Sequence, residues 1–335
     1  MRENTRATAS EWVGAHIYFE GGCDTQECDD VILDVVRPMV AAIASTTTLR
    51  NWFYIRYVDD GPHLRVRFRP TDEAQCGHVA ASASSYLSDV ISARLDGRQR
   101  ADPDATINTL GCGSPGARRV KSFSWRTYEQ EVERFGGPFG VEVSETLFCA
   151  SSCVALKMLD PIRAADRSSR LGRAALCMVV LAHGLSRSRE RVAHLSRMFG
   201  RHYLSGIFGV EPRLDTWLEL FDKRFDKQSL ALAEHLNVVC GMLDDDRPVS
   251  DSLDELREAA RHARRDLESL FTSGKLLLDN TLPKTIDEAI LRLGAIYVHL
   301  MNNRLGLTTI EEAYVAHLVR RVLEEPAKQF SAASA

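Results

Sequence analysis

The segment that decides the fold runs from Trp52 to Arg69 and has the sequence WFYIRYVDDGPHLRVRFR. Its two ends are rich in aromatic and β-branched residues, which are typical of strands. Between them stands Asp59-Asp60-Gly61-Pro62, a cluster of turn-forming residues. We therefore predict a β-hairpin, with one strand over Trp52–Tyr57 and the other over His63–Arg69.

The second strand of this hairpin has a regular alternation. Successive side chains of a strand point to opposite faces, which places Leu64, Val66 and Phe68 together on one face. The other face then carries one imidazole and three guanidinium groups, roughly 7 Å apart, from His63, Arg65, Arg67 and Arg69. The strand contains no acidic residue. Because each arginine can bind a carboxylate through two parallel hydrogen bonds, the pattern predicts either an anion-binding row or a solvated cationic face.

The remainder of the first third predicts mixed α and β structure. Trp12–Phe19 has the composition of a strand and ends before a Gly-Gly pair. Asp30–Ala44 and His78–Leu95 have helical periodicity, and we expect Pro38 to bend or divide the first of them. Residues Arg94–Ser122 are enriched in Gly, Pro, Asp, Ser and Arg, so we expect an exposed and mobile loop there.

From Glu142 onward the sequence predicts helices almost throughout. The predicted helices are Ser144–Leu159, Ala164–His183, Ser188–Leu204, Arg213–Leu243, Ser252–Phe271, Ile286–Asn303 and Ile310–Glu324. Capping-box patterns mark two helix starts, Ser252-x-x-Glu255 and Thr308-x-x-Glu311.

These elements predict an α+β fold, with an N-terminal antiparallel sheet that contains the hairpin, followed by a mainly helical body. We expect one domain over residues 1–335. Its strand-rich part should span about 12–140 and its helical part about 141–325.

Composition excludes several classes of function. The 335 residues include 42 Lys plus Arg and 46 Asp plus Glu, for a formal net charge of −4, which disfavours a polycation that coats nucleic acid. The longest apolar run, Ala174–Ala182, is about half the length that a bilayer requires. Met1–Ser10 has no apolar stretch of signal-peptide type. We therefore expect a cytoplasmic protein with no membrane association.

The cysteines do not predict a metal site. None of the eight stands in C-x-x-C spacing, and no histidine lies at zinc-finger spacing from them. A chain of this length does not need disulfides to fold, so we expect free thiols and no bound metal.

A second candidate segment is Thr127–Gly137, with the sequence TYEQEVERFGG. Glu131 and Arg134 stand three positions apart, and the glycine pair allows a sharp turn directly after them. Taken alone, the segment is better explained as a surface stretch with ordinary charge pairs that ends in a loop.

A third candidate segment is Tyr297–Leu305, with the sequence YVHLMNNRL. His299, Asn302 and Asn303 are spaced i, i+3 and i+4, so they share one face of the predicted helix. Gly306 follows where a helix C-terminus favours glycine. Taken alone, His299 is either a general base or a histidine satisfied within the core.

In this order, the strings WFYIRY–DDGPHLRVRF, YEQEVERFGG followed by ETLF, and VHLMNNRL resemble one known family. It is the C-terminal elimination domain of class I lanthipeptide dehydratases, the nisin-type enzymes, together with stand-alone thiopeptide biosynthesis proteins built on that domain. The resemblance extends from about Trp12 to Glu325, which is nearly the whole chain.

The resemblance implies a lyase that eliminates glutamate from glutamylated Ser or Thr of a ribosomal precursor peptide, leaving dehydroalanine or dehydrobutyrine. No cofactor is implied. The expected catalytic residues are His299, Arg67, Arg134 and Glu131. The expected substrate-binding residues are Arg65, His63, Arg56, Asn303 and Arg304.

The expected partners are the precursor peptide, with its leader and core, and a separate enzyme that glutamylates it from glutamyl-tRNA. Direct contact with nucleic acid is not expected. Two alternatives stay open. One is a thiopeptide pyridine synthase on the same scaffold, which joins two dehydroalanines in a [4+2] aza-cycloaddition and releases the leader. The other is a non-catalytic subunit that binds the precursor.

Overall fold

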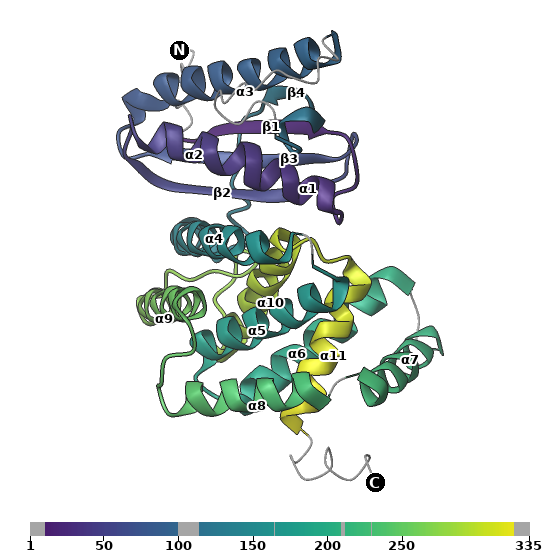
Figure 1. The fold of residues 1–335 in the computed structure, drawn as a ribbon. Helices are drawn as coiled ribbons and strands as arrows, with labels where there is room; N and C mark the ends of the chain where they lie inside the picture. The colour runs from purple at the N-terminus through teal and green to yellow at the C-terminus, as the bar shows by residue number, and fades with distance from the viewer. Residues whose placement is uncertain (1–10, 100–113, 164, 209–211, 229, 325–335) are drawn as a thin grey trace. The chain divides into compact units, whose positions relative to one another are not determined.

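A computed structural model describes most of the chain (Figure 1). The described residues are 11–99, 114–163, 165–208, 212–228 and 230–324. The chain divides into two compact units, Met1–Gln130 and Glu131–Ala335. The first contains the sheet and the second is helical, which confirms the predicted α+β class. The assignment of one domain to the whole chain stays a prediction.

The N-terminal unit contains a four-stranded antiparallel sheet with the order β2-β3-β1-β4. The strands are β1 (Val13–Phe19), β2 (Leu49–Tyr57), β3 (His63–Pro70) and β4 (Val120–Trp125). Strands β2 and β3 form the predicted hairpin, and Tyr57 pairs with His63 next to the turn. Asp60 and Gly61 in that turn have positive φ angles of 60° and 96°. Hairpin turns that contain an Asp-Gly pair require such angles at both residues.

Strand β4 was not predicted, and its first three residues, 120–122, fall within the expected loop Arg94–Ser122. That expectation was wrong at both ends, since helix α3 continues to Gln99 and β4 begins at Val120. Only the pairing of β4 with β1 makes this largely exposed edge segment a strand. Residues 100–113 lie outside the described part of the chain.

Helices of the N-terminal unit pack on the apolar face of the sheet (Figure 1). They are α1 (Gln26–Val31), the π-helical turn η1 (Ile32–Val36), α2 (Arg37–Ala44), the short 3-10 turns η2 (Glu73–Gln75) and η3 (Ala117–Arg119), and α3 (Cys76–Gln99). The π-helical turn comes just before Pro38, which lacks the N–H that a regular helix would use. Leu64, Val66 and Phe68 are fully buried, as their alternation predicted.

The C-terminal unit is a helical assembly. Its elements are α4 (Gly137–Leu159), η4 (Asp160–Ile162), α5 (Arg167–Ser186), α6 (Arg189–Phe208), α7 (Pro212–Gln228), α8 (Leu230–Asp244), α9 (Asp251–Thr272), α10 (Ile286–Arg304) and α11 (Thr309–Glu324). The single helix predicted over Arg213–Leu243 is therefore two helices. Helix α5 contacts α6, α8, α9, α10 and α11, which explains why its apolar run Ala174–Ala182 has apolar residues on every side.

One of the two predicted capping boxes is present. The backbone N–H of Thr308 donates to Glu311 at 2.8 Å, and the N–H of Glu311 donates to the Thr308 hydroxyl at 3.4 Å. The box predicted at Ser252 was wrong, because α9 starts at Asp251 and Asp254 accepts from the N–H of Val249 instead.

One helical stretch, 137–162, is long and apolar enough to cross a membrane by length and composition alone. Within it, 56% of the most apolar window is buried inside the structure, and a core helix passes the same test. This is weak evidence for a membrane span.

Candidate functional site

The polar face of the sheet carries Arg65 and Arg67 side by side on β3, each partly exposed. The guanidinium carbon of Arg65 lies 3.2 Å from the centroid of the Tyr57 ring, and its Nε donates to His63 at 3.2 Å. The guanidinium carbon of Arg67 lies 4.3 Å from the Tyr128 ring centroid. Aromatic faces hold these guanidinium groups in place without neutralising their charge, so the face can attract an anion.

Two imidazoles lie beside these arginines. His16 of β1 stands directly opposite Arg65, and its ring stacks on His63 at a centroid distance of 4.9 Å. Burial, together with the charges of His63 and Arg65, lowers the pKa of His16 to about 4. Burial likewise lowers the pKa of His63. Both rings are therefore neutral at pH 7, and the positive charge of this face comes from the arginines.

His16 was not predicted as a site residue. The alternation within Trp12–Phe19 indicates which residues of this strand lie on the same face as His16. The alternation does not reveal that β1 pairs with β3. That pairing joins segments almost fifty residues apart, and no local pattern specifies it.

Arg56 lies on the opposite, apolar face, because the hairpin register pairs it with Leu64. It is only 4% exposed, and its guanidinium donates to Asp29 at 2.7 Å and to the carbonyl of Cys23 at 2.8 Å. These are the contacts of a buried structural ion pair that ties β2 to α1. We therefore do not include Arg56 in the proposed site, although the sequence led us to expect that it binds substrate.

In the C-terminal unit, Glu131 and Arg134 form a tight turn. Arg134 Nη1 donates to Glu131 Oε2 at 2.8 Å, and its backbone N–H donates to the Glu131 carbonyl at 3.0 Å. Gly136 and Gly137 follow with φ angles of 95° and 81°, which side-chain-bearing residues rarely adopt. A Cβ on Gly137 would also lie 3.0 Å from the Cβ of Leu277. The glycine pair therefore fixes where the Arg134 turn joins α4.

A cavity of about 380 Å³ opens beside Arg134. The turn contributes Glu133 and Arg134 to its wall. Helix α10 contributes the face that contains Arg292, Ala295 and Ile296. The rest of the wall comes from Met198, Phe199 and His202 of α6, Leu291 of α10, and Leu278 and Asp279 of the loop before α10. Its volume is within the range of about 300–1,000 Å³ that is typical of ligand-binding pockets.

His299 lies on the same face of α10, one helical turn beyond Ala295 and Ile296. Its side chain is 26% exposed, and Nδ1 contacts both oxygens of Glu312, at 3.0 Å and 3.2 Å. Glu312 is 2% exposed, and burial raises the pKa of its carboxyl group although the hydrogen bond from His299 opposes this. A buried carboxylate on one ring nitrogen fixes the orientation of the imidazole and directs Nε2 away from Glu312.

Glu312 is the main residue that the sequence did not reveal. It follows Glu311, whose capping role was predicted, and nothing in its local pattern distinguishes it. Asn302, predicted to share a face with His299, also approaches Glu312, with Nδ2 at 3.5 Å from Oε2.

The two remaining predicted residues lie at the end of α10. Arg304 is fully buried, and its Nε donates to the Ser152 hydroxyl at 2.9 Å. The carbonyl of Asn303 accepts from the N–H of Gly306, which ends the helix with a φ of 73°. Arg304 therefore joins α10 to α4, which is a structural contact.

The described residues contain no group of three or more His, Cys, Asp or Glu side chains that could hold a metal ion. The seven cysteines in that part of the chain form no disulfide with one another. The chemical groups that the structure offers are thus an oriented imidazole, buried and exposed carboxylates, and guanidinium groups.

Residues 12–323 match the family described as lantibiotic biosynthesis dehydratase C-term, and the chain belongs to this family. A curated relative is the nisin biosynthesis protein NisB of Lactococcus lactis subsp. lactis, 28% identical over 113 residues. That alignment covers 34% of this chain and 9% of NisB.

Solved structures share the fold. The pyridine synthase TbtD from thiomuracin biosynthesis has a TM-score of 0.65 at 18% identity, over 93% of this chain and 97% of TbtD. The tRNA-dependent lantibiotic dehydratase MibB from Microbispora sp. 107891 has a TM-score of 0.59 at 22% identity, over 94% of this chain and 28% of MibB. TsrL has a TM-score of 0.57 at 19% identity, over 96% of this chain and 97% of TsrL.

Proposed function

We propose that this protein is a lyase that eliminates glutamate from glutamylated Ser or Thr residues of a ribosomally made thiopeptide or lanthipeptide precursor. The observation that carries this proposal is the pair formed by His299 and the buried Glu312. The His299 imidazole is held in one orientation by the contact of its Nδ1 with Glu312, and it is partly exposed to solvent. Such an arrangement suits a general base. Membership in the dehydratase family supports the substrate class.

In the proposed step, Nε2 of His299 removes the α-proton of the esterified residue. The electron pair of the Cα–H bond forms the Cα–Cβ double bond as the Cβ–O bond breaks. The products are dehydroalanine or dehydrobutyrine and free glutamate, whose carboxylate is a good leaving group. Glu312 stabilises the imidazolium that forms on His299.

Cationic groups near the reacting atoms would assist this step. Negative charge develops on the adjacent carbonyl and on the leaving carboxylate, and guanidinium groups there act preferentially on the transition state. We assign this role to Arg65, Arg67 and Arg134, with Glu131 orienting Arg134 through their 2.8 Å hydrogen bond. His63 orients Arg65 in the same way.

The proposal also requires a glutamyl ester to be supplied. No part of the mechanism forms such an ester, so we propose a separate glutamyl-tRNA-dependent enzyme as a partner. The precursor peptide is the substrate shared by the two.

The test is to incubate the purified chain with a glutamylated precursor peptide and follow its mass. Elimination removes one glutamic acid for each modified residue, without added cofactor. His299→Ala should slow the reaction by about 10²- to 10⁴-fold, the usual contribution of a general base. His262→Ala is the matched control, since His262 is an exposed histidine on α9. Equal rates in the two variants would remove His299 from the mechanism.

The second candidate function is pyridine synthesis by [4+2] aza-cycloaddition. The similarity of the fold to that of the pyridine synthase TbtD extends over 97% of the TbtD chain, and it supports this second candidate function. Incubation with a dehydrated, azole-bearing peptide distinguishes the two, because a cyclase would form a ring and release the leader. A chain that binds both peptides and converts neither would be a precursor-binding subunit.

A further inference from the structure

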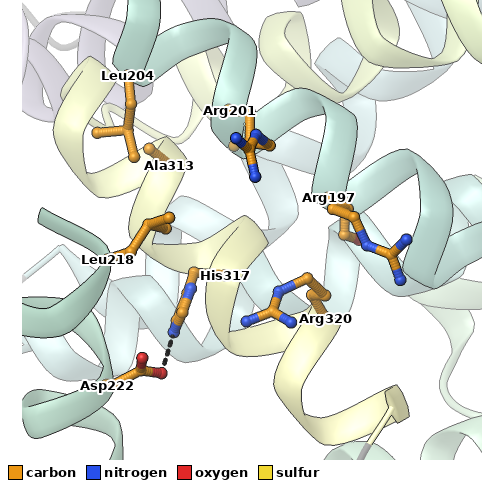
Figure 2. A pocket seen from close by; sticks show the side chains of 10 residues that line it. Arg197, Arg201, Leu204, Leu218, Asp222, Ala313, His317 and Arg320 are labelled. Atoms are coloured by element: carbon orange, nitrogen blue, oxygen red, sulfur yellow. Dashed lines mark hydrogen bonds and ion pairs between the residues drawn. The ribbon is translucent and has the colours of Figure 1, made fainter. Parts of the chain in front are cut away.

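A second cavity lies between α6, α7 and α11 of the C-terminal unit (Figure 2). Its volume is about 210 Å³, below the range of about 300–1,000 Å³ for drug-sized ligands. The helices leave this space unfilled because the residues between them, Ser196, Gly200 and Ala313, are small. The cavity therefore has room for a small ligand.

This cavity is separate from the one beside Arg134. Both use helix α6, but they use different faces of it. Arg197 and Arg201 line the smaller cavity, whereas Met198 and His202 line the larger one. Occupancy of the smaller cavity thus does not depend on the elimination chemistry proposed above.

Arginines from two helices line the smaller cavity. Figure 2 shows the side chains of Arg201 on α6 and Arg320 on α11 directed toward the cavity, while the side chain of Arg197 on α6 points away from both of them at its edge. Glu324 at the end of α11 forms ion pairs with both Arg197 and Arg320. The exposed guanidinium of Arg201 has no carboxylate partner among the residues that the structure describes.

The carboxylate that lines the cavity, Asp222 of α7, already has two partners. It accepts from His317 Nε2 at 2.8 Å and forms an ion pair with Arg321. Burial by itself raises the pKa of Asp222, but the hydrogen bonds from Arg321 and His317 lower it below its usual value, so the group stays ionised at pH 7. Three arginines and one carboxylate line the cavity. With the neighbouring ion-pair partners Glu324 and Arg321 included, there are four arginines and two carboxylates, so an excess of positive charge remains.

We propose that this cavity binds a small tetrahedral oxyanion, namely a phosphate ion or a phosphomonoester group. Its guanidinium groups come from two different helices, so they approach a ligand from different directions. A tetrahedral oxyanion presents oxygens in all of these directions, whereas a planar carboxylate presents two oxygens in one plane. Arginine is well suited to such contacts because its planar donor fork matches phosphate oxygens.

The test is calorimetric titration of the full chain with inorganic phosphate in a low-salt chloride buffer. Saturable binding is expected, and it should be tighter than the binding of malonate, a planar dicarboxylate of similar charge. Arg201→Gln should weaken phosphate binding by about 10- to 100-fold, because it removes hydrogen bonds to a charged group. Arg265→Gln, at an exposed arginine of α9, is the matched control and should bind as the parent does.

Arg320→Gln is a second variant from the other helix, and it too should weaken binding. Titration with glycerol phosphate identifies the source of the ligand, because tighter binding than that of inorganic phosphate indicates a phosphomonoester. Absence of saturable phosphate binding would overturn the proposal. So would malonate binding as tight as that of phosphate, or equal weakening by Arg201→Gln and Arg265→Gln.

Discussion

Replacing Glu312 by glutamine tests the proposed base most directly. The substitution keeps the size of the side chain and an oxygen that can accept from His299 Nδ1, but it removes the negative charge. We expect kcat for glutamate elimination to fall while KM stays nearly constant, because the charge acts on the imidazolium that forms during the reaction. Glu312→Ala should lower kcat further, since it also frees the ring to rotate.

The expected size of the decrease in kcat follows from the geometry of the contact between His299 and Glu312. The two Nδ1–oxygen distances of 3.0 Å and 3.2 Å and the 2% exposure of Glu312 describe a charge-assisted hydrogen bond shielded from water. Such bonds contribute about 1.5–3 kcal/mol, against about 0.5–1.5 kcal/mol for neutral ones. The loss of roughly 1–2 kcal/mol corresponds to a decrease in kcat of about 5- to 30-fold.

Glu312→Gln should lower kcat but raise the stability of the folded protein. Burial raises the pKa of Glu312 in the folded protein above its value in the unfolded chain. The folded state then holds this proton more tightly, so stability falls as the pH rises from the unfolded value, near 4.5, through the folded value. Glu312→Gln lacks this loss. We expect the variant to gain stability relative to the parent between pH 4 and pH 7, measured as the urea midpoint.

The kinetic assay is steady-state elimination from a glutamylated peptide at several peptide concentrations, followed by mass spectrometry over a range of pH. Asp244→Asn provides the control, because Asp244 forms a His–carboxylate pair with His183 at 3.3 Å outside both cavities. Unchanged kcat and an unchanged pH profile in folded Glu312→Gln would refute the positioning role of Glu312.

Three further predictions follow from local geometry. Gly137→Ala should lower stability by about 1–2 kcal/mol, because its φ of 81° is unfavourable for alanine; Gly77→Ala, with no atom within 4 Å of the new Cβ, should not lower the melting temperature. Thr308→Ala should cost about 0.5–2 kcal/mol through loss of the cap, a value that denaturant titration measures. The hydrogen bond with Cys28 lowers the pKa of Cys23 to about 7, so iodoacetamide should alkylate Cys23 increasingly between pH 6 and pH 8 and leave buried Cys28 unmodified; equal labelling of both thiols would contradict this.

The sequence alone determined the features that depend on short spacings. Turn-forming residues between two β-rich runs specified the hairpin, and strict alternation separated Leu64 and Val66 from Arg65 and Arg67. Helical periodicity located the helices of the C-terminal unit except for the division between α7 and α8, and Thr308-x-x-Glu311 marked the start of α11. Each of these patterns involves residues only a few positions apart, so a single sequence contains all the information required.

Only the tertiary structure decided which distant residues meet. Pairing with β1 made β4 a strand, and the same sheet brought His16 next to Arg65. Packing of α1 on the sheet gave Arg56 its partner, Asp29, 27 positions away in the chain. The turn between α10 and α11 and the packing of α11 on α6 placed Glu312 beside His299. Such contacts result from the burial of whole helices and strands, and this burial depends on the complete apolar surface of the fold, so no local motif encodes it.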